Sequence, residues 1–120
     1  MNNYKELKVW QKSMDLVELV YKLTSLFPKE EKYGLISQIQ RCAVSIPSNI
    51  AEGAGRNSNK EFKHFISIAN GSSNELSTQL HLSIRIGYIN ENEVTEIFKL
   101  LTEIQKMNYT LIKKFSNLKS

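Results

Sequence analysis

The chain has few of the residues that form disulfides, bind metal ions or interrupt helices. Its 120 residues include one cysteine, two histidines, two prolines and five glycines. The single cysteine, Cys42, excludes an internal disulfide and fits a reducing compartment, where we expect it to act as a small apolar filler. No apolar run approaches the roughly 20 residues that span a bilayer, and the first dozen residues lack a signal peptide's apolar core. We therefore expect a cytoplasmic protein with no membrane partner.

The scarcity of histidine also argues against a metal centre. Glu61 and His64 have the Glu-x-x-His spacing of di-iron bundles, but such sites need a second copy of the motif. The other histidine, His81, is preceded at the matching position by Thr78. The glycine-rich segment 53–56 lacks the lysine and hydroxyl residue that complete a phosphate loop. No arrangement of nucleophile and base emerges either, so we expect no enzyme activity, no metal and no cofactor.

Hydrophobic periodicity predicts four amphipathic helices and no strand. Phe27-Pro28 ends the first helix, Ser58 with Glu61 forms a capping box, and Gly87 is a natural left-handed stop. The expected helices span about residues 7–27, 33–55, 59–86 and 91–117. Their short connections predict an all-α, antiparallel up-down-up-down four-helix bundle, with residues 1–120 as one domain. The last helix carries an apolar heptad interrupted by Asn108, a polar residue that would fix register or pair with another helix.

The segment 38–56 combines small residues with a proline inside a helical pattern. Its polar residues Arg41, Ser45, Asn49, Glu52 and Arg56 are spaced four, four, three and four apart, which places them on one helix face. Pro47 is expected to break or kink this helix. A second small patch surrounds Gly71, so the second and third helices should approach closely there. Packing between helices of one subunit and contact with another subunit explain these features equally well. The residues that we assign to helix packing or oligomer contact are Ser45, Pro47, Asn49, Glu52 and Gly71.

The net charge of +4 is unevenly placed along the chain. Residues 32–90 carry six basic residues against three acidic ones. Lys60 and Lys63 share a face at the start of the third helix, close to Arg56 across a short turn, where the helix dipole also favours phosphate. A solvated helix end is the alternative explanation. The candidate phosphate-binding residues are Arg41, Arg56, Lys60, Lys63 and Arg85.

The chain resembles the 23S rRNA-intervening-sequence proteins of bacteria over about residues 7–86. The block Ser45-Ile46-Pro47-Ser48-Asn49-Ile50-Ala51-Glu52-Gly53 is its most specific part. The other matching residues are Trp10, Gln11, Tyr21, Phe27, Pro28, Glu31, Tyr33, Gly34, Leu35, Gln38, Arg41, Arg56, Ser58, Phe62, Ala69, Gly71, Ser72, Glu75 and Leu76.

This resemblance implies a non-enzymatic four-helix bundle that assembles into a ring, typically a homopentamer. Related accessory variability determinant proteins of diversity-generating retroelements bind nucleic acid and partner a reverse transcriptase. The sequence departs from the family pattern at Asn70, where a basic residue commonly precedes Gly71.

Together these observations predict a non-catalytic homo-oligomer, expected to be a pentamer, that binds RNA or DNA through basic residues without reading sequence. The alternative is a self-assembling scaffold or adaptor for a protein partner such as a reverse transcriptase, with no nucleic-acid role.

Overall fold

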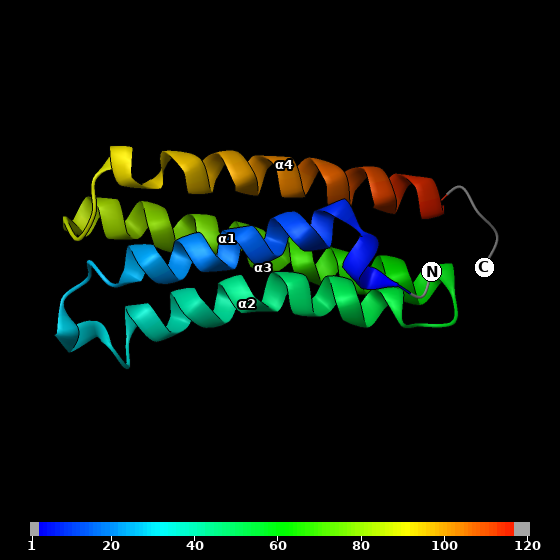
Figure 1. Cartoon of the computed structure of the whole chain (residues 1–120), viewed down its shortest axis with the longest axis horizontal. Helices are drawn as coiled ribbons and strands as arrows, with labels where there is room; N and C mark the ends of the chain where they lie inside the picture. The colour runs from blue at the N-terminus through cyan, green and yellow to red at the C-terminus, as the bar shows by residue number, and fades with distance from the viewer. Residues whose placement is uncertain (1–2, 117–120) are drawn as a thin grey trace.

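Four long helices lie side by side in the computed structural model, which describes residues 3–116 (Figure 1). Two short 3-10 turns, η1 and η2, precede α1 and α2, and no strand occurs in the part of the chain that is described. The elements are η1 (Tyr4–Glu6), α1 (Lys8–Thr24), η2 (Lys29–Glu31), α2 (Leu35–Ala54), α3 (Asn59–Ile86) and α4 (Glu91–Ser116). The predicted all-α class is therefore confirmed.

The helices form a square in which each one packs against its two neighbours. Contacts join α1 to α2, α2 to α3, α3 to α4 and α4 to α1, and within residues 3–116 the Cα atoms of diagonally opposite helices stay more than 8 Å apart. The α2–α3 pair has the most extensive contact. Because the connections are short, successive helices run antiparallel in a body of 48 × 23 × 20 Å. The beginning of α1, the α2–α3 turn and the end of α4 consequently lie at the same end of the bundle (Figure 1).

The predicted helix limits hold best for α3 and least well for α1. The range 59–86 is confirmed, whereas α1 ends at Thr24 because Leu26 and Phe27 donate tighter backbone bonds to residues three positions earlier. The second helix begins at Leu35 rather than near residue 33. The fourth helix extends to Ser116, and residue 117 lies outside the described residues.

Each helix contributes one apolar stripe to a continuous core. In α1 the buried stripe includes Leu16, Val20 and Leu23, whereas Met14 and Tyr21 on the adjoining face of the helix are 41% and 47% exposed. The predicted heptad of α4 is buried at Val94, Ile97, Leu101, Ile104, Asn108 and Phe115, whereas Leu111 is partly exposed and Leu118 lies outside the described residues. The largest fully buried apolar side chains are Leu16, Val20, Ile39, Ile46, Ile50, Ile66, Leu76, Leu80, Val94 and Ile104.

Helix caps fix the ends of α3 and α4. The Ser58 hydroxyl accepts a hydrogen bond from the Glu61 backbone N–H (3.1 Å), as the capping box predicts. Gly87 adopts a left-handed φ of 95°, and Tyr88 N–H donates to Ser83 O, which completes a Schellman motif. Asn90 and Glu93 then bond each other's backbone N–H groups reciprocally at the start of α4.

Pro47 lies inside α2 and does not break it. The helix runs continuously from Leu35 to Ala54 with Pro47 buried, so of the predicted break or kink the break does not occur. Proline removes only its own N–H, and the adjacent turns keep their bonds while the buried ring packs in the bundle. The Asn49 side chain adds a bond of its own by donating to the Ser45 carbonyl oxygen (2.8 Å).

Gly53, rather than Gly71, permits the closest approach of α2 to α3. A Cβ on Gly53 would lie 2.9 Å from the Phe65 Cβ and 3.2 Å from the Phe62 carbonyl oxygen. A Cβ on Gly71 would meet no atom within 4 Å. The close approach predicted around Gly71 occurs at its neighbour Ser72, which contacts Cys42 (3.0 Å) and Ser45 (2.8 Å) of α2, while Gly71 itself has open space beside it.

One carboxylate ties the two loops at the other end of the bundle. Glu31 accepts hydrogen bonds from the Leu35 backbone N–H (3.0 Å) and the Tyr88 hydroxyl (2.7 Å). These two bonds, the backbone bond foremost, hold the pKa of Glu31 below its usual value. The bond to the Glu31 carboxylate raises the pKa of Tyr88. The loop before α2 is thereby linked to the turn between α3 and α4.

Replacing the two glycines separately should change stability in opposite directions. Gly53→Ala forces the α2–α3 contact apart and is expected to lower the free energy of unfolding by about 1–3 kcal/mol. Gly71→Ala has open space around it and should raise that free energy by roughly 0.5–1 kcal/mol through helix propensity. Urea denaturation of both variants and the parent measures the difference. Equal effects from the two substitutions would contradict the packing described.

The Glu31 contacts predict a pH dependence of stability. A carboxyl whose pKa is depressed by folding stabilises the protein above its unfolded pKa and loses that contribution as pH falls below about 4.5. Tyr88, whose folded pKa is raised, loses its contribution as pH rises above about 10. Melting temperatures across this range should therefore depend less on acid pH in Glu31→Gln, and less on alkaline pH in Tyr88→Phe. A parent-like pH profile in both variants would refute the link.

Candidate nucleic-acid interface

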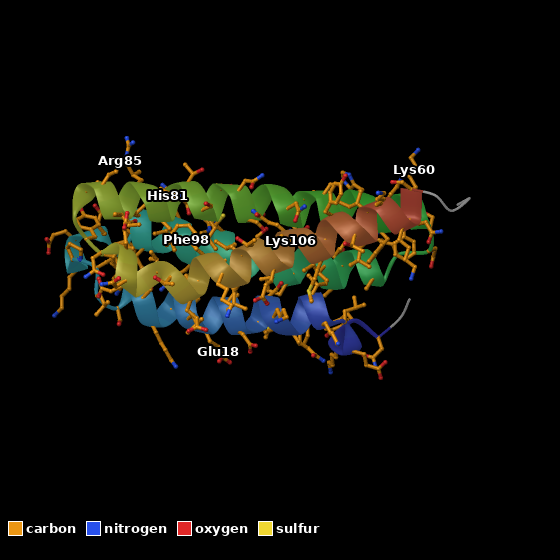
Figure 2. All side chains as sticks on the ribbon, turned by 90° about the horizontal axis from the view of Figure 1, so that it is seen from above. Glu18, Lys60, His81, Arg85, Phe98 and Lys106 are labelled. Carbon is orange, nitrogen blue, oxygen red and sulfur yellow. The ribbon has the colours of Figure 1, made fainter. Side chains whose placement is uncertain are left out.

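The five predicted phosphate-binding residues do not form one cluster. Arg56, Lys60 and Lys63 lie around the α2–α3 turn, whereas Arg85 lies in the last turn of α3. Figure 2 shows Lys60 and Arg85 at opposite ends of the bundle. Their separation along α3 is about 38 Å at 1.5 Å per residue. Arg41 lies part-way along α2, so the set comprises one group of three residues and two isolated arginines.

Arg56 is occupied by groups of its own subunit. Its guanidinium lies 3.0 Å from Glu52, as the four-residue spacing predicts, and 3.9 Å from Glu61. The same group lies 4.8 Å from the centre of the Phe65 ring, in cation–π geometry. These exposed ion pairs offset the charge that Arg56 could offer to a phosphate. Lys60 and Lys63 form no ion pair in the described part of the chain, although the Lys63 ammonium donates to the Ser116 hydroxyl (3.4 Å).

Arg41 borders a polar groove of about 310 Å³ between α2 and α3. Glu75 lines the same groove, which makes this site less favourable for an anion than the α2–α3 turn. Ser45 and Ser72 meet there with their hydroxyl oxygens 2.8 Å apart, and the Asn49 amide donates to the Ser45 hydroxyl (2.9 Å). Ser45 and Asn49 therefore join α2 to α3 within one subunit.

Cys42 lies beside this groove with its thiol held inside the bundle. The thiol donates to the Ser72 carbonyl oxygen (3.0 Å). Burial, followed by the Glu75 charge, raises the pKa of Cys42 to about 12. The thiol is therefore protonated at neutral pH, which agrees with the expected role as a filler and makes a reactive nucleophile unfavourable.

The folded chain gathers positive charge where the sequence alone did not suggest it. We call the end that holds the α2–α3 turn, the start of α1 and the end of α4 the basic end (Figure 1). It carries eight basic residues against three acidic ones, Glu6, Glu52 and Glu61. Counted over the loops and the six helical residues nearest each end, the opposite end carries four basic and five acidic residues. By the same count the eight basic residues of the basic end are Lys5, Lys8, Lys12, Arg56, Lys60, Lys63, Lys113 and Lys114.

Five of these cations were missing from the predicted site: Lys5, Lys8, Lys12, Lys113 and Lys114. The lysines late in the last helix were visible in the sequence, but a helix C-terminus favours cations for its own electrostatic reasons. The missing signal was topological, because an even number of antiparallel helices brings the first and last helix ends to the α2–α3 turn. Packing of the Phe62 ring against the Phe115 ring, with centroids 4.8 Å apart, fixes α4 to α3 at this end.

The side of the bundle formed by α1 and α2 exposes several large apolar side chains. Met14, Tyr21 and Val44 are each at least 40% exposed, and Trp10 and Val17 are half-buried. We call these five residues the α1–α2 apolar face. Several large apolar groups exposed on neighbouring helices are typical of a contact surface.

The Glu61–His64 pair does not gather further ligands. Glu61 lies toward Arg56, and the exposed His64 ring packs edge-on against Phe65 with centroids 5.4 Å apart. Among residues 3–116, no three His, Cys, Asp or Glu side chains come close enough together to hold a metal ion. None of the described helices is both long and apolar enough to cross a membrane.

Comparison with known proteins identifies the family. No curated protein matches the chain. A crystallised protein of unknown function, from the S23 ribosomal protein family of Bacteroides thetaiotaomicron, is similar in both sequence and fold. It shares 31% sequence identity and a TM-score of 0.81, over 88% of our chain and 98% of the crystallised one. A sequence model of 23S rRNA-intervening sequence proteins matches residues 5–110. The chain therefore belongs to the 23S rRNA-intervening sequence protein family.

Proposed function

We propose that the protein is a non-catalytic homo-oligomeric bundle that binds RNA or DNA through its basic end without reading sequence. The observation that carries this proposal is the uneven distribution of charge, since one end of the bundle holds eight basic residues and three acidic ones. Two of those acids, Glu52 and Glu61, are engaged by Arg56, which leaves the surrounding lysines to attract anions. Phosphate contacts of this kind position a nucleic acid but carry no sequence information.

Lys60 and Lys63 are the best-placed contacts of the predicted set. Both project from the first turns of α3, where the unpaired backbone N–H groups carry partial positive charge. Lys113 and Lys114 of α4 extend the cationic surface from the far side of the Phe62–Phe115 contact. Binding by such contacts releases counterions, so the affinity should fall steeply as salt is raised.

A paired set of double variants tests the location of binding. Lys60→Ala/Lys63→Ala should weaken the binding of a labelled single-stranded RNA and reduce the slope of log affinity against log salt by about 1.4. Lys29→Ala/Lys32→Ala removes the same charge from the opposite end and should leave affinity and slope nearly unchanged. Fluorescence anisotropy across a salt titration measures both quantities.

Either of two results would count against this site. Equal loss in the two double variants would mean that net charge, rather than the basic end, governs binding. A parent protein that binds no nucleic acid at low salt would remove the proposed function altogether. Arg56→Ala serves as an internal comparison, and we expect it to weaken binding less than the lysine pair because Glu52 and Glu61 already neutralise it.

The second candidate function is a scaffold that assembles with itself or with a protein partner such as a reverse transcriptase. The α1–α2 apolar face favours it, since Met14, Tyr21 and Val44 expose apolar area on two adjacent helices. The proposed homo-oligomer, with a pentameric ring as its expected form, would also use this face.

Tyr21→Glu should disrupt assembly by placing a charge on the α1–α2 apolar face, whereas Tyr33→Glu, on an exposed loop tyrosine, should not. Light scattering at micromolar concentration should give a mass several times 13.8 kDa for the parent and for Tyr33→Glu. Since burial of apolar area drives association, Tyr21→Glu should shift toward monomer. A monomeric parent would refute both the oligomer and the scaffold.

A further inference from the structure

A polar groove between α3 and α4 combines three kinds of group that recognise nucleic-acid bases and phosphates. It encloses about 650 Å³ and is lined by carboxamides, hydroxyls, one lysine and one tyrosine. No carboxylate lines it. The groups that matter here are Asn70, Asn74, Gln105, Lys106 and Tyr109. In Figure 2 the ribbon of α4 crosses in front of the bundle with Lys106 labelled on it, beside α3.

The carboxamides are held in place by each other. Gln105 donates its NH₂ group to the Asn74 oxygen, and the buried Asn108 donates to the Asn70 oxygen, both at 3.0 Å. Each asparagine therefore uses its oxygen within the pair and keeps its own NH₂ group as a donor, while Gln105 keeps its oxygen as an acceptor. The groove presents oriented donors and an acceptor, the two functions needed to pair with the edge of a base.

Tyr109 supplies an exposed aromatic ring between two lysines. The ring is 64% exposed, and Lys106 and Lys113 lie three residues before it and four residues after it, on the same side of α4. An aromatic side chain flanked by cations combines the stacking platform and the positive charge that proteins use to bind single strands. A second ring pair lies farther along the same helix pair, where His81 stacks on Phe98 with centroids 4.7 Å apart (Figure 2).

The carboxylates of both helices face away from this groove. Glu103, the one acidic residue in the described chain after Glu96, bonds Lys12 of α1 at 2.7 Å. Glu75 of α3 lines the groove on the α2 side. The α3–α4 groove is therefore free of the negative charge that would repel a phosphate, and it adjoins the basic end through Lys106 and Lys113.

We propose that the α3–α4 groove binds a single-stranded stretch of nucleic acid. The Tyr109 ring stacks on one base, and the Asn70, Asn74 and Gln105 carboxamides hydrogen-bond its edge. Lys106 and Lys113 neutralise the flanking phosphates. The inference rests on the proposed nucleic-acid function and adds strand specificity to it, because the bases of a duplex are stacked on each other and are inaccessible to the tyrosine ring.

The experiment compares a short labelled oligouridine with an RNA duplex of equal length, by fluorescence anisotropy at low salt. The parent should bind the single strand more tightly than the duplex. Tyr109→Ala should weaken single-strand binding about tenfold, the scale of one lost base stack, and leave the salt slope unchanged because no charge is removed. Tyr109→Phe keeps the ring and should stay within about twofold of the parent.

Tyr33→Ala is the matched control, since it removes another exposed tyrosine (88%) from the loop before α2. It should bind the single strand as the parent does. Equal affinity of the parent for both RNAs, or parent-like binding by Tyr109→Ala, would overturn the groove and leave the lysine result at the basic end standing. Absence of all binding by the parent would overturn the proposed function as well, so the two failures are distinguishable.

Discussion

Close contact between α2 and α3 at Gly53 is the constraint on which the rest of this structure depends. With only hydrogen on its Cα, that glycine lets the α2 backbone lie against Phe62 and Phe65. The short turn that follows then places Arg56 beside Glu61 and lets Ser58 cap α3. Because the other two connections also join antiparallel neighbours, the same end of the bundle also receives the beginning of α1 and the end of α4. The position of the lysines thus follows from one close helix contact.

Much of the fold could be predicted from the sequence because its signals are local. Apolar periodicity, the Ser58 capping box and the Gly87 stop depend on residues within a few positions of one another, and α3 was predicted to the residue. The errors came from features that depend on packing. The ring of Pro47 is tolerated within a helix held by its neighbours, and the orientation of Gly71 relative to α2 is set by how the helices are rotated in the bundle.

The candidate site was predicted only in part, for the same reason. Lys60, Lys63 and Arg56 are near in sequence and in space, whereas Arg85 lies at the far end of the same helix. The α3–α4 groove brings together residues more than thirty positions apart, such as Asn74 and Gln105, so no local sequence pattern predicts it. Asn70 departs from the family pattern of a basic residue. Here its oxygen accepts a bond from the NH₂ group of the buried Asn108, whereas an ammonium at position 70 would donate to the Asn108 oxygen instead.

Unequal charge at the two ends gives each bundle an electric dipole along its 48 Å axis. Two such molecules placed side by side attract when their axes oppose and repel when their axes agree. In a ring whose rotation axis runs along the helices, the dipoles of all subunits point the same way and all the basic ends lie on one rim. Apolar contact between subunits would then have to offset the electrostatic repulsion. Added salt, or a polyanion lying across that rim, would relieve the repulsion, which couples the assembly of the protein to its ionic surroundings.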